Sequence, residues 1–291
     1  MVIASIDFIL VILLFIYVII ATIQDIKTRE VPDWLNYSLI FIALFLRFLY
    51  SLINYEWSYF LYGIFGAFIF FIVGNIMYYT RQWGGGDSKL LMGIGATIPI
   101  YPSFLLNYIH PNLNLPFLFI LMVNILLVGG LYGIILSALI ALKHRAKFKT
   151  ELLKLLKKEK IKTEISYSIL IIAVMLFVSI YSKSVLRLVG IGMALFILIL
   201  GILLIFIKTV ENVSMYKIIS INKLTEGDWV VPFKYKNKMI NTSYLGITKK
   251  DIARFKDMKI KTVMVKEGLP FVPAFLIGLI ITLIFGNILA F

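Results

Sequence analysis

Long apolar runs alternate with short polar segments along most of this 291-residue chain. A helix needs about 17 to 25 predominantly apolar residues to cross the hydrocarbon of a bilayer. Runs of this kind predict eight spans, at residues 6–24, 36–54, 59–79, 88–109, 116–142, 165–181, 185–207 and 270–290. Only Ser182-Lys183-Ser184 separates the sixth and seventh runs, so a single long helix with a re-entrant end is the alternative there. The pattern predicts an all-α polytopic integral membrane protein with about eight transmembrane helices, six to eight being consistent with it.

The polar stretches divide the chain into five expected parts. These are a transmembrane domain (1–142), a basic amphipathic interfacial segment (143–164), a transmembrane hairpin (165–207), a small cytoplasmic α/β module (208–268) and a C-terminal transmembrane helix (269–291). In the interfacial segment, Phe148, Leu152, Leu155 and Leu156 recur at helical spacing and lysines fill the other face. Within the module we expect strands at 228–231 and 261–265, a polar turn or hairpin at 234–241 and a helix at 248–258.

Composition agrees with a membrane protein, because 61% of residues are hydrophobic and 15% are charged, against about 25% charged in soluble domains. Basic residues gather in loops that stay on the cytoplasmic side of a membrane. With eight spans, all but Arg47, Lys183 and Arg187 of the 29 Lys and Arg residues fall on one side. We therefore expect a multi-pass protein of the cell membrane with the 25–35, 80–89, 143–164 and 208–268 segments in the cytoplasm and both termini outside.

The net charge of +14 also bears on partners. The basic residues flank membrane helices, where anionic lipid headgroups are the nearest partner, so we expect lipid binding and no nucleic acid. The chain has no cysteine, and its two histidines, His110 and His144, are 34 positions apart. No thiolate or histidine metal site can be assembled from these residues, and we expect neither a metal nor another cofactor. Tryptophans near span ends, at 34, 57 and 83, are expected at the membrane interface.

Two aspartates carry the candidate chemistry: Asp25, after the first span, and Asp87, which follows Gly84-Gly85-Gly86 before the fourth. Both belong to the 1–142 domain and both are expected at the cytoplasmic face. Ionised carboxylates are costly near a bilayer, so a pair at one face suggests chemistry. Two carboxylates about 3 Å apart share a proton and can activate water against an amide, one as base and one as acid. The serine, cysteine and zinc hydrolase motifs are missing from the sequence.

Neighbouring residues are expected to support this pair. The three glycines permit positive φ and a close approach of the backbone to a bound peptide, while directing Asp87 toward the fourth helix. Lys27 and Lys89 each lie two positions after an aspartate and either steady its charge, bind substrate carbonyls or anchor the loop at the membrane. Helix dipoles disfavour a carboxylate after a helix and favour one before a helix, so Asp25 is expected to hold the shared proton.

These motifs resemble a known family. Asp25-Ile26-Lys27-x-x-x-Val31-Pro32 with Trp34-Leu35-Asn36, followed by Gly84-x-Gly86-Asp87-x-Lys89-Leu90, is similar to the prepilin peptidases among the GxGD aspartyl proteases, specifically their archaeal preflagellin and prepilin branch. The resemblance covers at least residues 1–110, and residues 267–275 extend it to the last span.

The resemblance implies an aspartic endopeptidase that cleaves class III signal peptides from archaellin or pilin-like precursors at the cytoplasmic face. Asp25 and Asp87 match the catalytic aspartates of the family. The chain lacks the cysteine-bearing region of bacterial members, so peptidase activity without N-methylation is expected. Two other classes stay open from the residues alone. One is a proton- or cation-coupled transporter that uses the same aspartates, and the other is a membrane anchor whose aspartates only cap helices.

Overall fold

A computed structural model of the chain describes all residues except 1, 237, 241–245 and 291. The chain forms two compact units, which we describe separately. Unit 1 consists of residues 1–133 and 268–291, and unit 2 consists of residues 134–267. The aspartates and the last helix therefore belong to one unit, although most of the chain's polar sequence lies between them.

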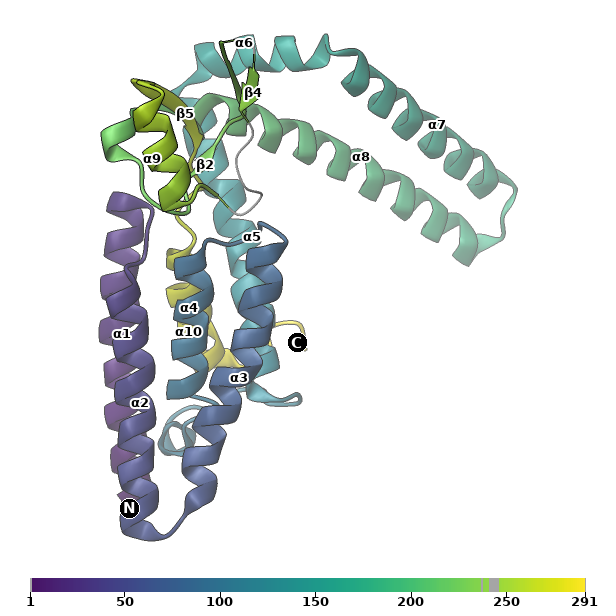
Figure 1. Cartoon of the computed structure of the whole chain (residues 1–291). Helices are drawn as coiled ribbons and strands as arrows, with labels where there is room; N and C mark the ends of the chain where they lie inside the picture. The colour runs from purple at the N-terminus through teal and green to yellow at the C-terminus, as the bar shows by residue number, and fades with distance from the viewer. Residues whose placement is uncertain (1, 237, 241–245, 291) are drawn as a thin grey trace. The chain divides into compact units, whose positions relative to one another are not determined.

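Unit 1 is helical, and its helices run alternately up and down (Figure 1). Its elements are α1 (Val2–Thr28), α2 (Asp33–Asn54), α3 (Trp57–Tyr79), α4 (Gly85–Thr97), the short 3-10 helix η1 (Ser103–Asn107), the first part of α5 (Phe117–Lys143) and α10 (Val272–Phe285). Helix α1 contacts α2, α4 and α10, and α4 contacts α2 and α3. The end of α1 and the starts of α2, α4 and α10 consequently meet at one end of the unit.

The expected spans are all helical, yet they differ in length. Six helices in the described chain (α1, α2, α3, α5, α7 and α8) are long and apolar enough to cross a membrane. Helices α4 and α10 have only 13 and 14 residues. The fourth span, expected at 88–109, ends at Thr97, because Pro99 disfavours helical geometry at Ile98, which has a φ of −130° and a ψ of 71°.

Glycine allows α3 and α4 to pack closely. A Cβ on Gly66 would collide with the Gly95 carbonyl, and a Cβ on Gly95 would collide with the Gly66 carbonyl. The buried face of α3 is accordingly rich in small residues. Small residues at helix interfaces let two membrane helices approach until their backbones touch. Helix α4, which carries Asp87, is thus held tightly against α3.

Buried polar side chains join other helices of unit 1. Asn124 of α5 donates from Nδ2 to Thr282 Oγ1 (2.9 Å) and to the Gly286 carbonyl (2.7 Å) at the end of α10. Arg47, of which 1% is exposed, donates to the carbonyls of Tyr59 (3.0 Å) and Thr97 (2.9 Å). Thr97 is the last residue of α4, so the Arg47 guanidinium caps the negative end of that helix.

Unit 2 begins with the end of α5 and contains α6 (Arg145–Leu156), α7 (Glu159–Tyr181) and α8 (Ser184–Ser214). Helices α7 and α8 pack as an antiparallel pair (Figure 1). The expected alternative of one long helix is wrong, because Ser182 and Lys183 have extended backbones that break the chain between them. Helix α7 begins at Glu159, within the segment expected to lie at the interface, whose amphipathic part is α6.

The rest of unit 2 is the small module that the sequence predicted. A three-stranded antiparallel sheet has the order β1 (Tyr216–Ser220), β5 (Thr262–Lys266), β2 (Trp229–Val230). The 3-10 helix η2 (Ile221–Lys223) follows β1, and the predicted hairpin is β3 (Phe233–Tyr235) with β4 (Lys238–Ile240). Residues 237 and 241 of that predicted stretch lie outside the described residues. Helix α9 (Lys249–Asp257) contributes its buried Phe255 to the same apolar cluster as Val263 and Val265 of β5. The sequence analysis missed β1.

Candidate functional site

Asp25 lies in the last turn of α1 and is buried, with 4% of its surface exposed. Its Oδ2 accepts a hydrogen bond of 2.8 Å from the backbone N–H of Val272, the first residue of α10. The first N–H groups of a helix lack partners within that helix, and they favour a negatively charged group. The start of α10, far away in the sequence, therefore holds the Asp25 carboxylate.

Asp87 lies in the first turn of α4 rather than before it, since the helix begins at Gly85 with Gly84 as its N-cap. The Asp87 Oδ2 accepts a hydrogen bond of 3.1 Å from the Gly84 N–H. This is the backward half of a capping box; the forward half needs an N-cap side chain, which glycine lacks. Each aspartate is thus fixed by one N–H at a helix start.

The structure brings the two aspartates together at one end of unit 1. The negative charge of Asp25 acts on the Asp87 carboxyl, so the two groups interact electrostatically. The charge of Asp25 also acts on Tyr132 of α5. The sequence did not indicate that the start of α10 or Tyr132 lies near Asp25, because both are more than 100 positions away from it in the chain.

The dipole of α1 was expected to place the shared proton on Asp25, because the negative end of a helix disfavours a carboxylate. In the structure the positive end of α10 also faces Asp25 through Val272, and this opposes the effect of α1. Asp25 thus lies at the end of α1 and faces the start of α10, whereas Asp87 lies at the start of α4, so the dipole of α1 alone no longer assigns the proton.

The expected role of the glycines is wrong in one respect. Gly84 has a φ of −70°, and Gly85 and Gly86 are helical, so none of the three uses positive φ. Close approach does occur at Gly86, but the neighbour is the chain itself: an added Cβ would lie 2.9 Å from the Val31 carbonyl oxygen and 3.2 Å from the Val31 nitrogen. Gly86 lets the α1–α2 connection rest directly on the turn that carries Asp87.

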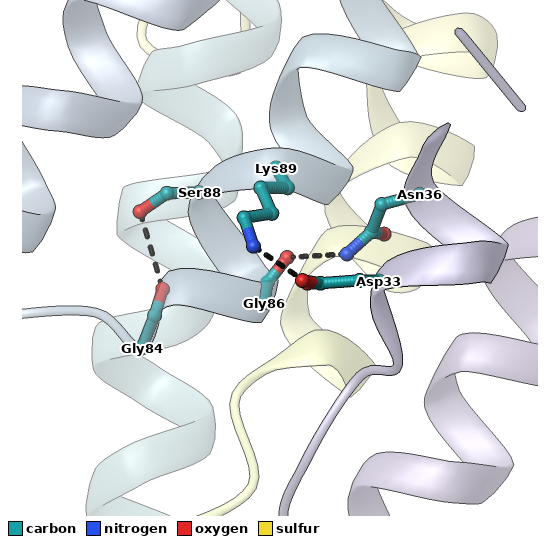
Figure 2. Close-up of polar contacts among 6 residues, drawn as sticks. All are labelled: Asp33, Asn36, Gly84, Gly86, Ser88 and Lys89. Carbon is teal, nitrogen blue, oxygen red and sulfur yellow. Dashed lines mark hydrogen bonds and ion pairs between the residues drawn. The ribbon is translucent and has the colours of Figure 1, made fainter. Parts of the chain in front are cut away.

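Figure 2 shows the polar contacts that join this turn to the start of α2. Asn36, which is fully buried, donates from Nδ2 to the Gly86 carbonyl at 3.1 Å. Lys89 forms an ion pair of 2.6 Å with Asp33, and Ser88 Oγ donates to the Gly84 carbonyl at 3.2 Å. The Asn36 hydrogen bond and the Lys89–Asp33 ion pair therefore connect the starts of α2 and α4, whereas the Ser88 hydrogen bond lies within the first turn of α4.

The two lysines that were expected near the aspartates lie elsewhere. Lys89 pairs with Asp33 and lies 5.4 Å from the Tyr37 ring centre. Lys27 is exposed, and within the described part of the chain it makes no hydrogen bond or ion pair with either aspartate. The cation whose charge acts on Asp25 is Arg29, which directly follows α1, has a φ of 59° and donates to the Gly268 carbonyl at 3.0 Å. Sequence reasoning missed Arg29 because its partner is distant in the chain.

Trp83 is not an interfacial residue. Only 4% of it is exposed, and its ring packs against Phe271 (centroids 5.5 Å apart) and Phe275 (5.0 Å) at the start of α10. Trp83 directly precedes Gly84, so this aromatic cluster joins the turn of Asp87 to the helix that holds Asp25. This aromatic packing therefore links the turn that carries Asp87 to the start of α10, which binds Asp25.

Known proteins resemble the part of the chain that contains both aspartates. Residues 12–142 match the family model described as "Type IV leader peptidase family". The chain is 30% identical to the preflagellin peptidase of Methanocaldococcus jannaschii, over 50% of this chain and 63% of that protein. It is also 30% identical to the preflagellin peptidase of Methanococcus maripaludis, over 51% of this chain and 66% of that protein.

A third preflagellin peptidase, from Methanococcus voltae, is 39% identical over 28% of this chain and 35% of its own length. The matches thus cover less than two thirds of each of these relatives. No solved structure matches the chain significantly. The residues matched by the type IV leader peptidase family model, 12–142, include both aspartates, the three glycines and the start of α2.

Proposed function

We propose that this protein is a membrane aspartyl endopeptidase that removes class III signal peptides from archaellin or pilin-like precursors. The observation that carries the proposal is the pairing of Asp25 and Asp87 at one end of unit 1, inside the segment that matches the peptidase family. The names of the relatives, preflagellin peptidases, support the substrate class.

The chemistry follows from two neighbouring carboxyl groups that share one proton. The ionised carboxylate takes a proton from a water molecule, whose oxygen attacks the scissile carbonyl carbon. The protonated carboxyl donates to the carbonyl oxygen and so prevents negative charge from building up there. When the carbon–nitrogen bond breaks, the amine leaves with a proton from the aspartate pair. The other aspartate takes a proton from a hydroxyl of the diol as the new carboxyl group forms, so the pair returns to its starting state with one proton. The products are a new carboxyl terminus and a new amino terminus.

The site is proposed to face the cytoplasm. Lys27, Arg29, Arg81 and Lys89 lie in or beside the connections next to the aspartates, and positively charged connections stay on that side. Helix α6, with lysines at 147, 149 and 154, is proposed to lie on anionic lipid headgroups. Class III leaders are short and basic and precede a hydrophobic helix, so a precursor held in the same membrane would present its cleavage site at this face.

The test uses the purified full-length chain in liposomes with a panel of leader-bearing archaellin and pilin precursors. Wild-type protein should cleave at least one precursor, and Asp25→Asn and Asp87→Asn should each abolish cleavage while remaining folded. Asp7→Asn is the matched control, because Asp7 lies on the same helix as Asp25 but bonds to the Tyr59 hydroxyl (2.6 Å). Cleavage that survives either substitution at 25 or 87 would overturn the proposal. Proton flux without any cleavage would favour the transporter.

A further inference from the structure

Asn36 is a fully buried amide at the start of α2, and it makes one directional contact with the turn of Asp87. Its Nδ2 donates to the carbonyl oxygen of Gly86 at 3.1 Å (Figure 2). This carbonyl belongs to the same planar peptide group as the backbone nitrogen of Asp87. The hydrogen bond to the Gly86 oxygen therefore restricts rotation of the peptide group that contains the Asp87 nitrogen.

We infer that Asn36 is a positioning residue for Asp87, a role that rests on the proposed peptidase function. Asn36 does not contact a reacting atom in this account. It fixes the orientation of the Gly86–Asp87 peptide group, and this group in turn directs the Asp87 carboxyl toward Asp25.

The sequence before Asp87 explains why such a contact is needed. Three consecutive glycines have no side chains to restrict the backbone or to pack against a neighbour. The turn must consequently be held by groups from other elements. The Val31 backbone limits the position of Gly86 by contact alone, and Lys89 pairs with Asp33 one turn further along the helix. Among the side-chain contacts described between α2 and this turn, the Asn36 bond is the one nearest to Asp87.

The hydrogen bonding of Asn36 is poorly satisfied, which is unusual for a residue that serves stability alone. Its Oδ1 is buried and has no partner within the described part of the chain. Asn124 also has a buried Oδ1 without a partner, yet its Nδ2 makes two hydrogen bonds that join α5 to α10. Burial removes both polar groups of the Asn36 amide from water, and only one hydrogen bond, to Gly86, compensates for the lost solvation. That bond is at the place where the orientation of the backbone matters for Asp87.

The experiment compares Asn36→Leu with Asn124→Leu in full-length protein, since both changes replace a fully buried amide by an apolar side chain of similar size. We expect Asn36→Leu to lower kcat about 10- to 100-fold with KM within about threefold, because small misplacement of a catalytic group costs factors of this size. Asn124→Leu should lower the unfolding temperature and leave kcat within about threefold. Asn36→Gln, which keeps an amide donor, should recover part of the lost kcat.

If Asn36→Leu does not yield folded protein, Asn36→Ala takes its place, because it removes the donor without adding a charge or a larger side chain. The inference is overturned if the donor-free variant keeps kcat within about threefold of wild type, or if Asn124→Leu loses as much kcat as Asn36→Leu. Failure of the proposed function looks different. In that case wild-type protein cleaves no precursor, or cleaves equally well after Asp25→Asn or Asp87→Asn, and the role of Asn36 falls with it.

Discussion

Replacing Gly86 by alanine should disturb the aspartate pair more than any other single methyl group in the glycine turn. The added Cβ would lie 2.9 Å from the Val31 carbonyl oxygen and 3.1 Å from the Val31 Cβ. Ordinary van der Waals contact begins at 3.4 Å, so Gly86 and Val31 must separate by about half an ångström. Overpacking of this kind costs about 1–3 kcal/mol. Asp87 is the next residue, so we expect the cleavage rate to fall about tenfold or more.

Gly85→Ala is the matched control, one position away in the same turn. Its nearest neighbour would be Tyr78 Cε2 at 3.7 Å, an ordinary contact. Alanine also lowers the conformational entropy of the unfolded chain where its backbone geometry is allowed, which stabilises a protein by about 0.4–1 kcal/mol. We therefore expect Gly85→Ala to keep the wild-type rate within about twofold and to unfold at the same temperature or a higher one.

The assay measures initial cleavage rates of one leader-bearing precursor by gel shift, with enzyme reconstituted in liposomes. Thermal unfolding of the same preparations, followed by circular dichroism, separates loss of fold from loss of rate. Equal rates for Gly85→Ala and Gly86→Ala would refute the reasoning, because the two changes differ in the space available to the methyl group. A wild-type rate for Gly86→Ala would show that the Val31 contact does not determine the position of Asp87.

Two further predictions concern stability. Arg47→Lys cannot donate to both Tyr59 and Thr97 in the bidentate geometry of a guanidinium, and it should destabilise the protein by about 1–3 kcal/mol; an unchanged unfolding temperature would contradict this. Thr248→Ala removes the N-cap of α9, so amide exchange of Lys249–Asp257 should accelerate about fivefold for a cost of about 1 kcal/mol. Hydrogen bonds from Thr248 hold the pKa of Asp251 below its ordinary value. That contribution is therefore complete at neutral pH and is lost as the pH falls through the lowered pKa of the folded state, so the exchange ratio of variant to wild type should be smaller at pH ~3 than at pH ~7, and an equal ratio would contradict it.

Much of the architecture could be predicted from the sequence, because length and periodicity of apolar runs are local properties. Each of the eight expected spans contains a helix, although the fourth and eighth are helical over only part of their expected length, and the module has its predicted hairpin, helix and two strands. Asp25 and Asp87 could also be expected at one end of the helices, since spans that alternate in direction place their connections at two ends. The predicted lengths of α4 and α10 were too long, because an apolar run shows which residues can lie in lipid but does not show where the helix ends.

The surroundings of the aspartates depended on tertiary structure. Val272 and Asp25 are 247 positions apart, and Asn36 and Gly86 are 50 apart. No periodicity of one segment reports which face of another segment it meets. Lys27 and Lys89 were considered as supporting residues or membrane anchors because they are close to the aspartates in the chain, whereas Arg29, Asn36 and the start of α10 make the contacts in the structure. The sequence by itself determined the helices and the two carboxylates, because these follow from the solubility and spacing of neighbouring residues. Only the packing of α1, α2, α4 and α10 decided which groups hold those carboxylates, because hydrogen bonds and van der Waals contacts act over a few ångströms in space.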